Sequence, residues 1–571
     1  MVVSRPSTSP SRSRRLRRLV PLLVLAAGAL AGGLVAGGAH VPAERRLATQ
    51  FAAAWEREAY AEMYAMLTPQ SRAETSLRRF GRAYRRARVT ATLAWLRAGR
   101  PGDVRNDAVT VPFEVRTRVF GDLEAAVTLP LSEGEDGEPA VAWSPHLAFP
   151  GLRPGERLRR STRMPERGTI VARDGTPMAE GEERLSDLDP LASEIAGRVG
   201  PAPPEREDEL AERGVPKDAP VGLTGLEREF DDELGGGPGG ELLAGTRVLA
   251  SRAPRPGRSV RTTIDPDVQR AAVQALAGRY GGIAAVRPRT GEVLALAGVA
   301  FSAPQPPGSV FKIITLAGAL EANTVRRNER FPVETAATLE GVELQNANGE
   351  SCGGTLIDSF AHSCNSVFAP MGAELGAEKL VAAAERFGFN QEPRLAGAAR
   401  STIPAAAEIG DDLAVGSTAI GQGKVLTTPL RMALVAAAIG EGGRLMEPTL
   451  LRGERTESSQ ATPAATARFI GRAMRAVVTD GTGVGAALDG VAVAGKTGTA
   501  ELRSTVSEDP VPAEPGEPPP AEDLTDTDAW FTAYAPAGNP TIAVCVLLIA
   551  QGAGGEVAAP AAAQVIDAAV G

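Results

Sequence analysis

The sequence predicts a multidomain α+β protein that carries a single N-terminal transmembrane helix. Its 571 residues are enough for three or four domains, and 43% of them are apolar, so the chain can build several cores. A basic stretch followed by a long uncharged run opens the chain. In the largest region a hairpin, many helices, three strands and a helix follow one another, an order typical of an antiparallel sheet covered by helices.

Residues 1–39 predict the membrane anchor. Residues 1–18 contain six arginines and no acid, and residues 19–39 contain no charge. Such a run spans about 30 Å, and the arginines indicate a cytoplasmic tail with the remaining chain outside the cell membrane. A cleavable signal peptide is the alternative, because Gly37 and Ala39 are small enough for a cleavage site. The length of the run favours an uncleaved anchor.

Two smaller regions follow the anchor. Residues 44–155 combine helical spacing of apolar residues with strand-like alternation, as expected of a small α+β domain whose core includes Trp55, Phe80 and Tyr84. Residues 156–258 are rich in proline, glycine and charge, and are expected to form a linker or pedestal.

Residues 259–571 predict the largest domain. Residues 504–527 hold many Pro, Glu and Asp and no aromatic residue, so they are expected to form a flexible loop between two strands. Strands are expected at 283–286, 292–299, 491–500, 530–535 and 541–549, and helices at 265–278 and 559–570.

Composition excludes several classes of function. With 61 Lys+Arg, 69 Asp+Glu and a net charge of -8, the chain is not expected to bind nucleic acid. Three cysteines are too few for a disulfide scaffold or a Cys-rich zinc site. The three histidines, at 40, 146 and 362, have no ligand spacing. We therefore expect no metal, no cofactor and a catalytic base other than histidine.

Lysine is the unusual cation of this chain. Only five of the 61 cations are lysine, and the other 56 are arginine. A buried lysine can lose its proton and act as a base, whereas arginine cannot, so each lysine is a candidate for that role. The five are Lys217, Lys312, Lys379, Lys424 and Lys496.

Three short motifs carry candidate chemistry. Ser309 and Lys312 lie at i and i+3 where a helix is expected to begin, so a neutral lysine could activate the serine hydroxyl. Ser363-Cys364-Asn365 follows further along the chain. Lys496-Thr497-Gly498-Thr499 lies on an expected strand, where the lysine could bind a carboxylate and the glycine could let a ligand approach the backbone.

In this order the three motifs resemble the active-site signature of serine penicillin-recognising enzymes, and their spacing suits the transpeptidase domains of penicillin-binding proteins. Further segments are similar to class B (monofunctional) members of this family. Residues 44–155 resemble the nuclear-transport-factor-two-like domain of the methicillin-resistance-type branch by size and position. The bias towards Arg, Ala, Gly and Pro indicates a high-GC bacterium. The further segments are Arg167-Gly-Thr-Ile, Ala419-Ile-Gly-Gln-Gly, Thr428-Pro-Leu-Arg-Met-Ala and Asp528-Ala-Trp-Phe.

The resemblance implies a fold and a reaction. The pedestal would be of the dimerisation type, and the last domain would be a serine D,D-peptidase with a five-stranded antiparallel sheet covered by helices. Ser309 would attack the penultimate D-Ala of a peptidoglycan stem peptide, with Lys312 as the base. An amine of a neighbouring strand would take the acyl group, and β-lactams would trap the serine. No glycosyltransferase domain fits upstream, which argues against the bifunctional class A, and a glycosyltransferase of the cell-wall machinery is an expected partner.

Each remaining motif residue has an implied role. Ser363 would pass a proton to the leaving amine, and Asn365 would orient Lys312. Lys496 and Thr497 would hold the terminal carboxylate. The N–H groups of Ser309 and Thr499 would form the oxyanion hole.

Two other interpretations stay open at this point. In a D,D-carboxypeptidase or β-lactamase, water would replace the acceptor amine, but the Glu-x-x-Leu-Asn motif of class A β-lactamases is incomplete, since Ala396 stands where Asn is expected. A β-lactam sensor or a division scaffold would need no turnover. Cys352 and Cys364 are either a disulfide or two buried thiols.

Overall fold

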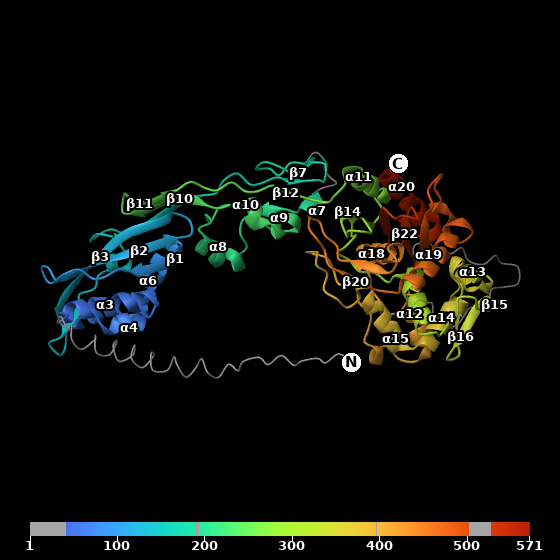
Figure 1. The fold of residues 1–571 in the computed structure, drawn as a ribbon, viewed down its shortest axis with the longest axis horizontal. Coiled ribbons are helices and arrows are strands. Elements are labelled where there is room, and N and C mark those ends of the chain that lie inside the picture. The colour runs from blue at the N-terminus through green and yellow to red at the C-terminus, as the bar shows by residue number, and fades with distance from the viewer. Residues whose placement is uncertain (1–40, 187, 189–192, 396, 502–526) are drawn as a thin grey trace, which may run out of the picture. The chain divides into compact units, whose positions relative to one another are not determined.

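The computed structural model describes residues 41–186, 188, 193–395, 397–501 and 527–571 (Figure 1). The predicted tail (1–18) and anchor (19–39) therefore lie outside the described residues. No helix in the described part of the chain is long and apolar enough to span a bilayer. The chain divides into two compact units. The first comprises residues 41–164, Pro203–Lys217 and Pro238–Pro254, and the second comprises Pro165–Ala202, Asp218–Gly237 and Arg255–Gly571.

The first unit has the α+β character that the sequence predicts. A four-stranded antiparallel sheet packs against helices, and β2 alternates buried and exposed residues along its length. The predicted core residues Trp55, Phe80 and Tyr84 are buried, and Trp143 Nε1 donates a hydrogen bond of 3.1 Å to the Tyr84 hydroxyl. The elements are α3 (Ala43–Glu56), α4 (Tyr60–Ala65), α5 (Pro69–Glu74), α6 (Leu77–Ala91), β1 (Leu93–Ala98), β2 (Ala108–Thr117), β3 (Gly121–Glu133) and β4 (Pro139–Val141).

The pedestal segment 156–258 contributes to both units. In the first unit it supplies a three-stranded sheet of β5 (Leu158–Arg163), β10 (Gly239–Ala244) and β11 (Arg247–Arg252), together with α8 (Glu207–Arg213). In the second unit it supplies short strands and helices around the motif that begins at Arg167. These are β6 (Ile170–Val171), β7 (Pro177–Ala179), α7 (Ser193–Ala196), β8 (Val199–Gly200), β9 (Val221–Gly222), α9 (Gly225–Glu229) and α10 (Asp231–Gly235), and β12 (Val260–Arg261) pairs with β6.

The second unit is built on a five-stranded antiparallel sheet of order β14-β13-β23-β22-β21. The predicted hairpin forms β13 and β14, and the three predicted C-terminal strands form β21, β22 and β23. Thr527 already belongs to β22, so the predicted loop 504–527 extends one residue too far, and its other residues lie outside the described part. The bounds are β13 (Gly281–Val286), β14 (Val293–Gly298), β21 (Ala494–Glu501), β22 (Thr527–Ala535) and β23 (Ile542–Leu548).

Helices cover both faces of this sheet, so strands β13, β14 and β23 are apolar throughout. Alternate residues such as Phe531 and Val544 face α11 (Pro266–Leu276) and α20 (Ala559–Val570). Their neighbours, such as Trp530 and Cys545, face the larger helical core, which contains α12 (Lys312–Glu321) and α18 (Pro429–Gly440) (Figure 1). The other helices of this side are α13 (Leu356–Ala361), α14 (Asn365–Leu375), α15 (Ala377–Arg386), α16 (Ala406–Ile409), α17 (Asp412–Ala419) and α19 (Ala464–Thr479).

Short strands beside α13 and α14 complete the second unit. β15 (Arg330–Glu334) pairs with β18 (Cys352–Thr355), and β16 (Ala336–Leu339) pairs with β17 (Val342–Gln345). A further pair consists of β19 (Arg444–Met446) and β20 (Ser458–Gln460).

Candidate active site

Ser309 lies in a tight turn directly before α12. The 3₁₀ turn Gly308–Phe311 leads into α12, which begins at Lys312, so the helix starts close to its predicted position. Gly308 has φ +53°, and a Cβ there would lie 2.5 Å from Thr499 O. Only glycine allows this approach, which brings the turn against β21. Ser309 itself is half-buried.

The side chain of Lys312 is fully buried and points to the second motif. Its Nζ lies 2.7 Å from Ser363 O, 3.2 Å from Ser363 Oγ and 2.6 Å from Asn365 Oδ1. The structure thus brings together three of the four predicted catalytic side chains by hydrogen bonds, and the fourth, Ser309, lies one turn before Lys312.

Burial determines the protonation of Lys312. It lowers the pKa of Lys312 well below that of an ordinary lysine, and the nearby charge of Lys496 lowers it further. A neutral amine has two N–H donors and one lone pair. Ser363 O and Asn365 Oδ1 accept hydrogen bonds from the two N–H groups. The lone pair of Lys312 is therefore free to take the proton of a hydroxyl group.

Two contacts fix the groups around Lys312. Asn365 Nδ2 donates to Gln345 O at 2.8 Å, which leaves Asn365 Oδ1 facing the amine. Ser363 has φ +60°, a conformation that costs a non-glycine residue about 1 kcal/mol. The N–H groups of Ser363 and Cys364 donate to Phe360 O and Ser359 O, so the end of α13 holds this strained residue in place.

The third motif lies on β21, the edge strand next to the Ser309 turn. Lys496 is fully buried with its Nζ 3.0 Å from Thr497 O and 5.6 Å from the centre of the Phe360 ring. Burial lowers the pKa of Lys496 to about 7. Gly498 leaves room for the turn, since a Cβ there would lie 2.9 Å from Pro307 O, and the approach of a ligand to its backbone stays a prediction.

Thr482 is a site residue that the motifs did not indicate. Its hydroxyl lies 2.5 Å from that of Thr497 and 3.3 Å from Ala361 O. It belongs to the Asp480–Val484 segment between α19 and β21, and its only sequence signal is a pair of flanking glycines. Thr499 lies two positions after Thr497 on β21. Its Oγ1 accepts a hydrogen bond of 3.5 Å from the N–H of Gly554.

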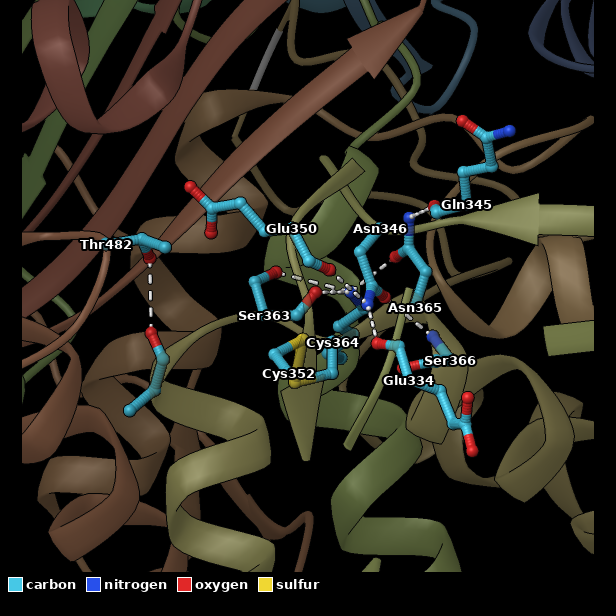
Figure 2. The surroundings of a disulfide bond; sticks show 12 residues. Glu334, Gln345, Asn346, Glu350, Cys352, Ser363, Cys364, Asn365, Ser366 and Thr482 are labelled. Atoms are coloured by element: carbon cyan, nitrogen blue, oxygen red, sulfur yellow. Dashed lines mark hydrogen bonds between the residues drawn. A yellow bond between two sulfur atoms is a disulfide. The ribbon is translucent and has the colours of Figure 1, made fainter. Parts of the chain in front are cut away.

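Burial separates the lysines into two groups. Lys312 and Lys496 are buried, and Lys217, Lys379 and Lys424 are exposed. His362 and Glu392 are exposed as well. Cys352 and Cys364, which the sequence left open, form a disulfide (Figure 2). In the described part of the chain, no three His, Cys, Asp or Glu side chains gather as a metal site would require.

Comparison with known families agrees with this geometry. Residues 281–567 match the penicillin-binding protein transpeptidase domain, which is half of the chain. The chain belongs to the penicillin-binding proteins. Residues 43–156 match the NTF2-like N-terminal transpeptidase domain, as expected for the methicillin-resistance-type branch of class B.

Relatives of this penicillin-binding protein include characterised enzymes and solved structures. The chain is 34% identical over 418 residues to the peptidoglycan D,D-transpeptidase PbpA of Mycolicibacterium smegmatis, covering 61% of this chain and 79% of that one. The structure of penicillin-binding protein A from M. tuberculosis as a ceftriaxone acyl-enzyme gives a TM-score of 0.57 at 27% identity, covering 71% and 98%. The D,D-transpeptidase domain of an Eggerthella lenta peptidoglycan glycosyltransferase gives 0.56 at 29% identity, covering 71% and 98%.

Proposed function

We propose that this protein is a peptidoglycan D,D-transpeptidase that cross-links stem peptides through an acyl-enzyme on Ser309 and binds β-lactams covalently at the same residue. One observation carries the proposal: a buried lysine with a lowered pKa lies one turn from the serine, and its two N–H groups are already taken by Ser363 O and Asn365 Oδ1. The family and the activity of its relatives support the same reaction.

Acylation follows from these positions. Ser309 Oγ attacks the penultimate D-Ala carbonyl while the lone pair of Lys312 takes the hydroxyl proton. The oxyanion accepts hydrogen bonds from the backbone N–H groups of Ser309 and Thr499, and each bond contributes about 3 kcal/mol to stabilising the transition state. The proton then passes through Ser363 to the nitrogen of the departing D-Ala.

The remaining motif residues bind the substrate carboxylate, and an acceptor amine then releases the acyl group from the enzyme. Protonated Lys496 and the Thr497 hydroxyl hold the terminal carboxylate, beside Gly498 and Thr499 on β21. The amine of a neighbouring stem peptide attacks the ester on Ser309, which regenerates the serine. A β-lactam carries the same carboxylate, but its leaving nitrogen stays attached, so the acyl-enzyme persists.

Intact-mass measurement of the full chain in detergent tests this function. We expect one benzylpenicillin to add per chain within minutes and to remain for hours, and Ser309→Ala to show no adduct. An adduct that disappears within seconds while drug is consumed would favour the carboxypeptidase or β-lactamase interpretation. A stable adduct without turnover of a thioester stem-peptide mimic and a D-amino acid acceptor would favour the sensor or scaffold interpretation.

We also propose that residues 19–39 anchor the protein as a single-pass span with residues 1–18 in the cytoplasm and the catalytic unit outside. Protease added to intact spheroplasts is then expected to remove the second unit and leave a short membrane-bound fragment. Complete release of the protein from membranes by salt would contradict the anchor.

A glycosyltransferase of the cell-wall machinery is the proposed partner, because a transpeptidase needs newly polymerised strands. Crosslinking of the full chain in membranes is expected to capture such an enzyme.

A further inference from the structure

The disulfide lies inside the second motif. Cys364 stands between Ser363 and Asn365 and is fully buried, and its sulfur bonds that of Cys352 at the start of β18 (Figure 2). The two Cα atoms lie 5.7 Å apart. A covalent bond therefore joins the Ser363–Asn365 segment to the chain that runs from β15 to β18.

That chain contacts the motif through two hydrogen bonds as well. Gln345 O accepts the Nδ2 group of Asn365, and Asn346 Oδ1 accepts the N–H of Ser366, each at 2.8 Å. Asn346 is buried and its Nδ2 donates to Glu334 O and Glu350 O, so it ties together its own loop (Figure 2). We call residues 330–355 the wall of the site.

The apolar side chains that hold the strands β15, β16 and β17 of the wall against the helical core are only partly buried. Most residues of β15, β16 and β17 are exposed or half-buried, and these strands pair only within the wall. Its partly buried apolar side chains include Phe331, Leu339 and Leu344. A segment held by partly buried contacts opens locally at a lower free-energy cost than the core does, so the covalent bond adds to its attachment.

We propose that the Cys352–Cys364 disulfide is a positioning element of the active site, which keeps the wall against Asn365 so that the amide oxygen faces Lys312. This inference rests on the proposed function. Without the bond, the wall moves away from the motif and Gln345 O no longer fixes the Asn365 amide. Lys312 then loses an acceptor at 2.6 Å and gains access to water.

Reduction of the disulfide should produce the same displacement of the wall in a reversible way. A dithiol such as dithiothreitol supplies two electrons and two protons, the S–S bond breaks, Cys352 and Cys364 become thiols, and the dithiol becomes a cyclic disulfide. Acylation of Ser309 is then expected to slow by about tenfold or more, because misplacing a catalytic group by even about 1 Å is costly. Reoxidation restores the rate.

The test compares acylation by a fluorescent penicillin for the full chain, oxidised and dithiol-treated, with thiols counted by intact mass. The double variant Cys352→Ser/Cys364→Ser should acylate at the reduced rate and be insensitive to dithiol. Cys545→Ser is the matched control, because Cys545 is a buried thiol on β23 remote from the motif in sequence. It should keep the wild-type rate and its dithiol response.

A pH profile separates positioning from simple stabilisation. Water reaching Lys312 raises its pKa towards the ordinary value, so the rising limb of the acylation profile should move to higher pH in the reduced protein. If the reduced chain melts at lower temperature but acylates at the oxidised rate with an unmoved limb, the disulfide is only a staple and the inference is wrong. Failure of the oxidised chain to acylate would instead contradict the proposed function.

Discussion

Lys496 lowers the pKa of Lys312, although the two residues lie far apart in the chain. Both are fully buried, and each Nζ lies 5.6 Å from the centre of a phenylalanine ring, Phe368 for Lys312 and Phe360 for Lys496. Two like charges in one buried site disfavour each other, so one lysine is held neutral more strongly than the other. This repulsion lowers the pKa of Lys312, the lysine next to the serine, where a base is required.

This pairing predicts a bell-shaped pH profile for acylation of the free enzyme. Lys312 must be neutral, so the second-order rate constant rises as pH increases through its lowered pKa. Lys496 must be protonated to bind a carboxylate, so the constant falls above about pH 7. Stopped-flow acylation by a chromogenic cephalosporin between pH 5 and 10 measures both limbs.

Lys496→Arg is the control for the falling limb. Arginine keeps its charge throughout this range, so the limb near pH 7 should disappear even if the rate at low pH is reduced by the larger head group. A falling limb that stays in place in this variant would show that Lys496 does not produce it.

Lys496→Met is expected to stabilise the fold while it weakens β-lactam binding. Between pH 7 and about 10.4 the unfolded chain keeps a proton on this lysine that the folded chain has lost, so wild-type stability rises with pH in that window. Methionine removes this burial cost, and we expect a gain of about 1–3 kcal/mol at pH 7. Urea unfolding at pH 7 and pH 10 measures it, and the gain should shrink at the higher pH.

The sequence indicated which lysines are buried, but not how residues 156–258 divide between the two units. Scarcity of lysine made five positions candidates and the motifs selected two of them, Lys312 and Lys496, which the structure buries while it exposes the other three. The five-stranded sheet could be predicted because apolar runs in the sequence were long enough to be recognised as strands. The division of 156–258 between two units could not be predicted, because the paired strands β5 and β10 lie far apart in the chain and neither alternates apolar with polar residues in its sequence.

Two features of the site depend on long-range packing and so were missed or left open. Thr482 contacts Thr497 only because its loop folds back onto β21. An isolated threonine between glycines has no distinctive sequence pattern. The disulfide could not be predicted, because only the folded structure shows that the wall brings Cys352 to the start of α14. In both cases the information lies in the contact between segments and not in either segment.

Thr482→Val tests the role of the second hydroxyl. When the Thr482 O–H donates to Thr497 Oγ1, the Thr497 O–H is free to donate to a carboxylate. Valine removes that donor, so we expect the dissociation constant of the initial β-lactam complex to rise about 3- to 10-fold with little change in the acylation step. Thr482→Ser should restore binding, and Thr479→Val, at an exposed position of the same region, should have no effect. Equal losses in the Ser and Val variants would exclude the hydroxyl as the cause.

Glu227→Ala tests the buried ion cluster behind the Arg167 motif. Glu227 is fully buried, and its carboxylate contacts Arg167 at 2.6 Å and Arg184 at 2.5 Å. Removing it leaves two largely buried guanidinium groups with less compensation, which typically costs about 3–5 kcal/mol. We expect that loss in the unfolding of the second unit, measured by urea titration followed through Trp530. Glu457→Ala, which breaks the exposed pair with Arg394 in the same unit, should cost less than about 1 kcal/mol. Comparable losses in the two variants would show that burial does not set the strength of this cluster.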